Sequence, residues 1–170
     1  HTARQLGAGS PDKTSPAEHG TVAAIAEGRR FALELGKGGE EDVASARIFA
    51  CVHLLDHTER LVERTDDRRR VESVRRHPQL AGEVRELVAA LPDLAAGLQA
   101  GVIPEKTFAL VEESASDLEE DRRQFRRNAI EAGSEGKISG DELDELLDAH
   151  RWLRRVAYHC WRIAVYAGAK

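Results

Sequence analysis

Apolar residues recur at helical spacing along most of this 170-residue chain, whereas the alternating patterns of β-strands are nearly absent. The spacing predicts five helices, at residues 16–35, about 40–65, roughly 79–100, about 104–132 and 140 to about 167. Residues 1–14 lack periodicity and are rich in Gly, Ser, Thr and Lys, which indicates a flexible N-terminal segment. The fold class that follows is all-α, an antiparallel bundle of about five helices joined by short turns.

Capping and helix-breaking residues mark the ends of these segments. Ser15-Pro16-Ala17-Glu18 and Ser139-Gly140-Asp141-Glu142 both have the spacing of a capping box, so a helix is expected to begin at each. Gly101 is expected to end the third helix, and Pro92 predicts a bend or a split within it. Residues 66–78 (DDRRRVESVRRHP) are so polar that we expect an unpacked connector.

The last predicted helix is apolar on two of its faces. The two stripes are Leu143, Leu146, His150, Leu153, Ala157, Cys160 and Ala164, and Trp152, Val156, His159 and Ile163. A helix that is apolar on two faces must contact neighbours on both sides, so we expect this helix to occupy the centre of the bundle.

One short pattern occurs twice, 102 residues apart. The stretch LLDHTERLVE at 54–63 aligns with VAYHCWRIAV at 156–165, and the two lie on the second and fifth predicted helices. The preceding helices also correspond roughly at this offset. The chain therefore reads as one complete three-helix repeat at 79–168, packed as one domain with a partial first repeat at 15–66.

Two imidazoles and two guanidiniums occupy equivalent positions in the two copies: His57 with His159, and Arg60 with Arg162. Their repetition favours a structural role, in which each histidine donates to a carbonyl or carboxylate on a neighbouring helix. Each arginine is then expected to reach an acidic side chain such as Asp117 or Glu120, and such fixed polar contacts set helix register. An anion site or partner site at these positions is the alternative.

Charge and cysteine content narrow the classes of function. The net charge of −5 disfavours nucleic acid as a partner, because neutralising phosphates requires a basic surface. Cys51 and Cys160 fall inside apolar helical patterns, so we expect two buried free thiols rather than a disulfide. No apolar run approaches the roughly 20 residues that span a bilayer, and no signal peptide is visible. Because the chain opens with His1, we expect it to be a fragment of a longer protein.

His53 and His57 have a spacing at which two side chains of one helix can hold a metal ion. Two histidines four residues apart share a helix face and can bind zinc, and Asp56 is adjacent in sequence. However, Asp56 points about 100° away from His57 around the helix, and no Glu follows the first histidine as a zinc-protease motif requires. We favour the interpretation that one of the two imidazoles is buried and hydrogen-bonded and that the other is exposed. A metal-binding bundle is the alternative.

Other motifs favour a protein without chemistry of its own. Residues 131–142 imitate a calcium loop, but the first and third positions, Glu131 and Gly133, are poor ligands, so a plain helix turn is expected. No glycine-rich phosphate loop, nucleophile elbow or Cys-x-x-Cys pair occurs in the sequence. We therefore expect neither an enzyme nor a bound cofactor.

A basic band, Arg122-Arg123 with Arg126-Arg127, is expected to be a solvated face with pairs such as Glu119–Arg123. Docking on anionic lipid or on a membrane partner is the alternative for this band. Trp152 and Trp161 are expected to be anchors of the core and of an interface.

The two histidine-bearing segments carry a resemblance to the PhoU family, whose members consist of tandem three-helix repeats of about this length. The resemblance spans residues 16–168, and the stretch HRWLRRVAYHCWRI at 150–163 looks most like PhoU-like domains appended to bacterial sodium/phosphate cotransporters. The matching segments are VHLLDH at 52–57, RRVAYH at 154–159, DLEEDRR at 117–123 and AGSEGKI at 132–138.

The resemblance implies a cytoplasmic accessory domain that regulates phosphate uptake, tethered to the inner face of the plasma membrane. It would act by docking on a protein partner, such as the membrane domain of the same transporter. Apart from the resemblance, a plain oligomerisation module is a further alternative, with the second apolar stripe of the last predicted helix as its interface, so a homodimer is also considered. The signature-helix positions implied to carry binding are Asp56, His57, Arg60, His159 and Arg162.

One departure from the family removes its metal clusters from these expectations. The family holds metals with a Glu-x-x-x-Asp pair on the signature helix of each repeat. Here the pair reads Val52 and Asp56 in the first repeat, and Arg154 and Tyr158 in the second. Since three of four carboxylates are replaced, one of them by a cation that repels metal ions, no bound metal is expected.

Overall fold

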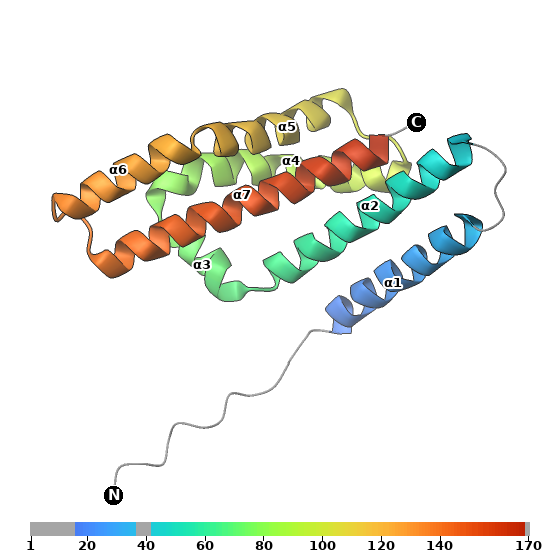
Figure 1. Cartoon of the computed structure of the whole chain (residues 1–170), viewed down its shortest axis with the longest axis horizontal. Coiled ribbons are helices and arrows are strands. Elements are labelled where there is room, and N and C mark those ends of the chain that lie inside the picture. Colours follow the sequence, from blue (N-terminus) through green and yellow to red (C-terminus); the bar gives the residue numbers. More distant parts are fainter. Residues whose placement is uncertain (1–15, 37–41, 169–170) are drawn as a thin grey trace, which may run out of the picture.

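The computed structural model describes residues 16–36 and 42–168, and these ranges are helical apart from short turns (Figure 1). The prediction of an all-α bundle is confirmed. The predicted flexible segment at 1–14 lies outside the described residues, and so does Ser15, the first residue of the first predicted capping box. The elements are α1 (Pro16–Gly36), α2 (Asp42–Thr65), α3 (Arg68–Arg76), the 3₁₀ turn η1 (Pro78–Leu80), α4 (Ala81–Ala100), α5 (Glu105–Glu120), α6 (Arg122–Ser134) and α7 (Gly140–Gly168).

The helix α7 occupies the centre of the bundle, as its two apolar stripes predicted. It runs between α2 and α5 in Figure 1, and it contacts α2, α3, α4, α5 and α6. Members of both stripes are buried, among them Leu153, Val156 and Ile163. By contrast, α1 packs on α2 along the outside of the bundle. None of the helices in the described ranges combines the length and apolar character that crossing a bilayer requires.

The expectation of an unpacked connector at residues 66–78 was wrong. The segment folds as α3 and leads into η1, and the Asp67 side chain caps α3 by accepting from the backbone N–H of Arg70 at 3.3 Å. Val74 is 4% exposed and Leu80 is fully buried, and both belong to the main core. The average polarity of the stretch concealed a short amphipathic helix, whose few apolar side chains share one face.

Two predicted helix boundaries also need correction. The predicted helix at 104–132 is interrupted at Asp121, which separates α5 from α6, although Phe125 still donates to the Asp121 carbonyl at 2.8 Å. Pro92 does not split the third predicted helix, since α4 continues through it from Ala81 to Ala100. Proline removes one backbone donor from the helix, and α4 nevertheless continues, with Ala90 and Leu94 buried on either side.

The two cysteines have different environments. Both are free thiols, as expected, but only Cys160 is buried, whereas Cys51 is exposed on α2. The helix α2 lies between α1 and α7 (Figure 1), its main neighbours, and Cys51 lies on a face of α2 that they leave uncovered. Periodicity identified the helix correctly and overestimated the width of its buried face.

Candidate functional site

The two equivalent histidines of the 102-residue repeat contact each other. His57 on α2 and His159 on α7 are 8% and 5% exposed, and their Nδ1 atoms are 2.9 Å apart. The two helices run in opposite directions in Figure 1. A residue that contacts its own equivalent lies near a local two-fold axis relating the two segments. The expectation that each histidine donates to a carbonyl or carboxylate was wrong, because the two imidazoles are partners of each other.

This pair is neutral in the folded chain near pH 7. Burial lowers the pKa of His159 to about 4, and the nearby Arg64 guanidinium acts in the same direction. Burial also lowers the pKa of His57, with a further contribution from Arg162. One imidazole must donate and the other accept, so the two rings carry different tautomers. The contact fixes the register of α2 against α7.

The two repeated arginines do not reach the acidic residues expected for them. Arg60 Nε donates to Asp56 Oδ2 at 2.9 Å on the same helix, and this contact holds the pKa of Asp56 below its usual value. Arg162 donates to the Tyr166 hydroxyl, and its guanidinium carbon lies 4.6 Å from the centroid of that ring. The expected contacts to Asp117 or Glu120 were therefore wrong, because each arginine finds a partner one turn away on its own helix.

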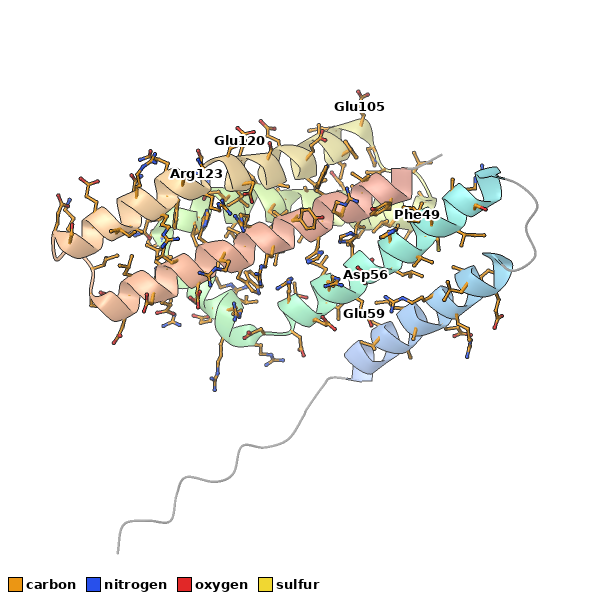
Figure 2. All side chains as sticks on the ribbon, in the orientation of Figure 1. Phe49, Asp56, Glu59, Glu105, Glu120 and Arg123 are labelled. Atoms are coloured by element: carbon orange, nitrogen blue, oxygen red, sulfur yellow. The ribbon has the colours of Figure 1, made fainter. Side chains whose placement is uncertain are left out.

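Two acidic residues of α2, Asp56 and Glu59, connect this helix to α1. Arg29 of α1 contacts Glu59 at 2.7 Å and Asp56 at 3.9 Å, and Figure 2 shows Asp56 and Glu59 on the part of α2 that faces α1. These side chains are about one-third exposed, so each pair contributes at most about 1 kcal/mol to stability. Asp56 thus joins α1 to α2 and lies apart from the histidine pair's hydrogen bond.

The alternative metal ligands, His53 and His57, are engaged with aromatic rings. The His53 ring stacks on Tyr166 at 5.0 Å and meets the edge of Phe49 at 4.1 Å, while His57 lies 5.7 Å from Tyr166. His57 also directs its Nδ1 to His159. Within the described ranges, no group of three or more His, Cys, Asp or Glu side chains is placed to hold a metal ion.

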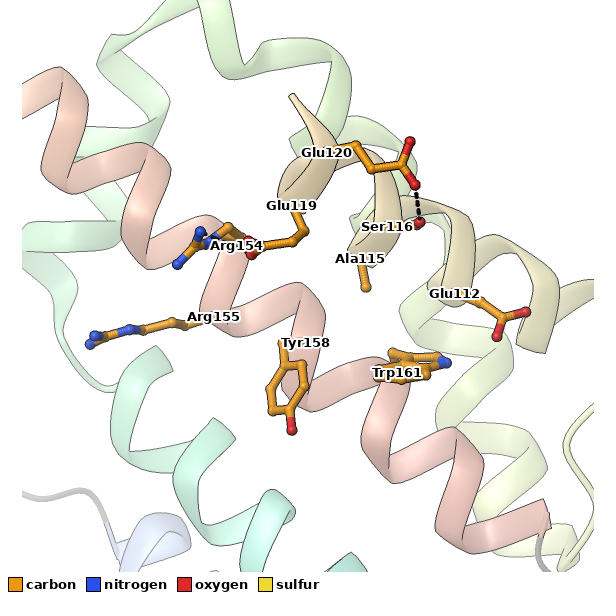
Figure 3. Close-up of a pocket in the computed structure, with 9 residues that line it drawn as sticks. All are labelled: Glu112, Ala115, Ser116, Glu119, Glu120, Arg154, Arg155, Tyr158 and Trp161. Atoms are coloured by element: carbon orange, nitrogen blue, oxygen red, sulfur yellow. Dashed lines mark hydrogen bonds and ion pairs between the residues drawn. The ribbon is translucent and has the colours of Figure 1, made fainter. Parts of the chain in front are cut away.

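A groove between α5 and α7 was not anticipated from the sequence. We call it the α5–α7 groove; its volume is about 620 Å³, and Figure 3 shows the side chains around it. Tyr158 is 45% exposed within it and Trp161 is half-buried, so two aromatic rings of α7 line the groove. Its lining residues are Glu112, Ala115, Ser116, Glu119, Glu120, Arg154, Arg155, Tyr158 and Trp161.

Charges of both signs surround these rings. Arg154 contacts Glu119 across the groove at 2.9 Å, and Ser116 donates to Glu120 at 3.0 Å along α5. The sequence did contain a signal, since Tyr158 lies outside both apolar stripes of α7. An aromatic residue outside the buried stripes of a central helix indicates an exposed ring. By comparison, Trp152 is buried and donates to the Arg64 carbonyl at 3.2 Å, which places it in the core.

In the basic band, Arg122 pairs with a neighbouring acidic residue, and the calcium-like loop ends in a helix cap. Glu119 contacts Arg122 at 3.7 Å, so the expected pairing of Glu119 with Arg123 is replaced by this neighbouring contact. In the loop, the Glu142 carboxylate accepts from the Ser139 backbone N–H and hydroxyl, both at 2.8 Å. The second predicted capping box is therefore confirmed.

The five sequence-predicted site residues are thus divided among three places. His57 and His159 meet in the interior, Asp56 and Arg60 pair at the surface of α2, and Arg162 packs against Tyr166.

No protein-family model, curated protein or solved structure matches the chain.

Proposed function

We propose that this chain is a regulatory helical domain of a phosphate transport system, which acts by docking on a protein partner rather than by catalysis. The observation that carries the proposal is the α5–α7 groove, where Tyr158 and Trp161 line a surface cavity. Both residues belong to the segment at 150–163 that resembles PhoU-like domains of sodium/phosphate cotransporters. The surface feature and the resemblance therefore coincide on one helix.

The composition of the groove suits a protein segment. Tyr, Trp and Arg are the residues most enriched at the energetic centres of protein interfaces, where an apolar centre is surrounded by a polar rim. Here Tyr158 and Trp161 form the centre, with Arg155 at one end and Glu112 on the α5 side. A partner that inserts an apolar side chain between charged flanks would cover the half-exposed Tyr158 ring.

The proposed partner is the membrane domain of the same transporter, with this domain at the inner face of the plasma membrane. Docking there would couple the domain to phosphate uptake without any reaction at the site. The buried histidine pair supports this role, because His57 and His159 bond to each other and hold α2 against α7. The helix α7, which supplies Tyr158 and Trp161 to the groove, is then held in a fixed position against α2.

Photo-crosslinking in cells tests the docking. A benzoylphenylalanine residue replaces Tyr158 in the full-length protein, and the matched control carries it at Val88, which is 54% exposed on α4 outside the groove. The proposal expects an adduct with the transporter's membrane domain from position 158 and none from position 88. Equal labelling from both positions, or an adduct from neither, would contradict docking at the groove.

The homodimer expected from the sequence is a separate proposal. Phe31 and Leu33 of α1 and Phe49 of α2 are 61%, 53% and 60% exposed, and Figure 2 shows where Phe49 lies on α2. The molar mass from light scattering during size exclusion decides it, since a monomer mass at about 100 μM would exclude a dimer tighter than that concentration.

A further inference from the structure

The α5–α7 groove carries opposite charges at its two ends. Figure 3 shows Arg155 at one end and Glu112 at the other, with Tyr158 and Trp161 between them. Neither Arg155 nor Glu112 makes an ion pair with a residue in the described ranges. The rise along α7 from Arg155 to Trp161 is about 9 Å, so the two ends are separated by nearly two helical turns.

The arginine end of the groove lacks a counter-charge. Burial lowers the pKa of Arg64 on α2, and the like charge of the nearby Arg155 guanidinium acts in the same direction. The Nε atom of Arg64 is also buried, and none of the described residues accepts a hydrogen bond from it. Because unpaired cations and unmade hydrogen bonds both cost free energy, a carboxylate supplied by a partner would stabilise this end of the groove.

The tryptophan end of the groove lacks a hydrogen-bond acceptor. The indole Nε1 atom of Trp161 is buried, and it has no hydrogen-bond partner among the described residues. The ring is held by Arg162, whose guanidinium carbon lies 5.4 Å from its centroid. A polar side chain of a partner would therefore find an unused donor in Trp161 and an unpaired carboxylate in Glu112, beside an apolar surface.

The walls of the groove suit a helix better than an extended segment. Both walls are interior turns of helices, whose backbone groups already bond along their own helix and offer no strand edge. The small side chains Ala115 and Ser116 line the α5 wall, and small side chains let two helices approach closely. The same helix pair already holds α4, which contacts both α5 and α7 and contributes no residue to the groove.

We propose that the α5–α7 groove takes one amphipathic helix of the partner, with a carboxylate side chain bound at Arg155, an apolar side chain on Tyr158 and Trp161, and a Lys or Arg bound at Glu112. The inference rests on the proposed docking function and specifies the segment that docks. An acidic and a basic residue about seven positions apart, with an apolar residue midway, share one helix face and match the separation of the two ends.

Photo-crosslinking from position 158 of the full-length protein tests the inference when it is combined with charge reversals. The test variants are Arg155→Glu and Glu112→Lys, which reverse exposed charges at the two ends of the groove. The matched controls are Arg85→Glu on α4 and Glu113→Lys on α5, which make the same reversals at exposed positions outside the groove. Circular dichroism establishes that the variants are folded, and mass spectrometry of the adduct locates the captured residue.

The captured residue is expected on a helix of the membrane domain that carries an acidic and a basic side chain about two turns apart. Each test variant should lower the adduct yield at least about fivefold, and each control less than about twofold, because a reversed charge then faces a like charge of the partner. Reversing the partner helix's acidic residue to Lys should restore the adduct with the Arg155→Glu variant.

Two different failures can be told apart. An adduct with the membrane domain that survives both reversals, or that maps to a segment without these charges, would overturn the inference and leave the docking function standing. The absence of any adduct from position 158 of the parent protein would contradict the docking function and this inference together.

Discussion

Replacing His159 by Asn should flatten the dependence of stability on pH between about pH 7.5 and pH 5. Asn places a hydrogen-bonding group close to where His159 Nδ1 meets His57, 2.9 Å away, but it carries no titrating proton. In the parent chain, burial lowers the pKa of His159 from 6.5 to about 4. Between these values the unfolded chain binds a proton at this residue that the folded chain does not bind.

The sign and size of the effect follow from that difference. The free energy of unfolding is highest above pH 6.5 and falls as the pH is lowered toward 4, by about 1.4 kcal/mol per pH unit. Over the range from pH 6.5 to pH 5, His159 therefore accounts for about 2 kcal/mol. The pKa of His57 is lowered as well, mainly by burial, so its contribution has the same sign. Ending the titration near pH 5 avoids Asp56, whose pKa is lowered from 3.8.

Urea unfolding followed by circular dichroism at a series of pH values measures the effect. The substitution also shifts the whole curve, so only the difference in slope is informative. His150 titrates in the same direction after burial lowers its pKa, and it leaves a residual slope in both proteins. The matched control is His53→Asn, which removes an imidazole from α2, the helix that carries His57, and keeps the His57–His159 hydrogen bond. If the free energy of unfolding of the His159→Asn variant depends on pH as steeply as that of the parent chain, the reasoning is refuted.

Three further predictions concern packing and thiol reactivity. Leu80→Ala should lower the free energy of unfolding by about 3 kcal/mol in urea titrations, because the side chain is fully buried; a loss below about 1 kcal/mol would contradict the packed η1. Gly97→Ala should cost about 1–3 kcal/mol, since its Cβ would lie 2.9 Å from the Val102 carbonyl oxygen, and a raised melting temperature would show that contact to be wrong. Cys51 should react with Ellman's reagent in the folded chain, whereas Cys160, whose pKa burial raises to about 12, should react only after unfolding.

Helix content was predictable because it depends on local periodicity and on capping residues. The two stripes of α7 predicted its central position, and the Ser139–Glu142 capping box marked its start. The helix at 68–76 was missed because it is short and its apolar contacts with the core come from Val71 and Val74. An average over a polar window cannot show that these residues share one face.

The candidate site was harder to predict than the fold, since it depends on contacts between helices. The 102-residue spacing identified His57 and His159 as equivalent, but equivalence alone does not show that two residues meet. That requires α2 and α7 to pack against each other, which only the tertiary structure shows. The arginines found local partners, because a side chain one turn away is closer than any carboxylate on another helix.

The docking proposal is tested most directly by phosphate uptake in cells that carry a charged residue in the α5–α7 groove. Tyr158→Asp places a carboxylate at the centre of the groove, and Val88→Asp introduces the same charge at an exposed position outside it. Radioactive phosphate uptake is measured in cells grown in scarce and in abundant phosphate. The account predicts that the Tyr158 variant loses the difference between the two conditions while the Val88 variant keeps it. Normal regulation by both variants, with both proteins folded and present at parental levels, would contradict it.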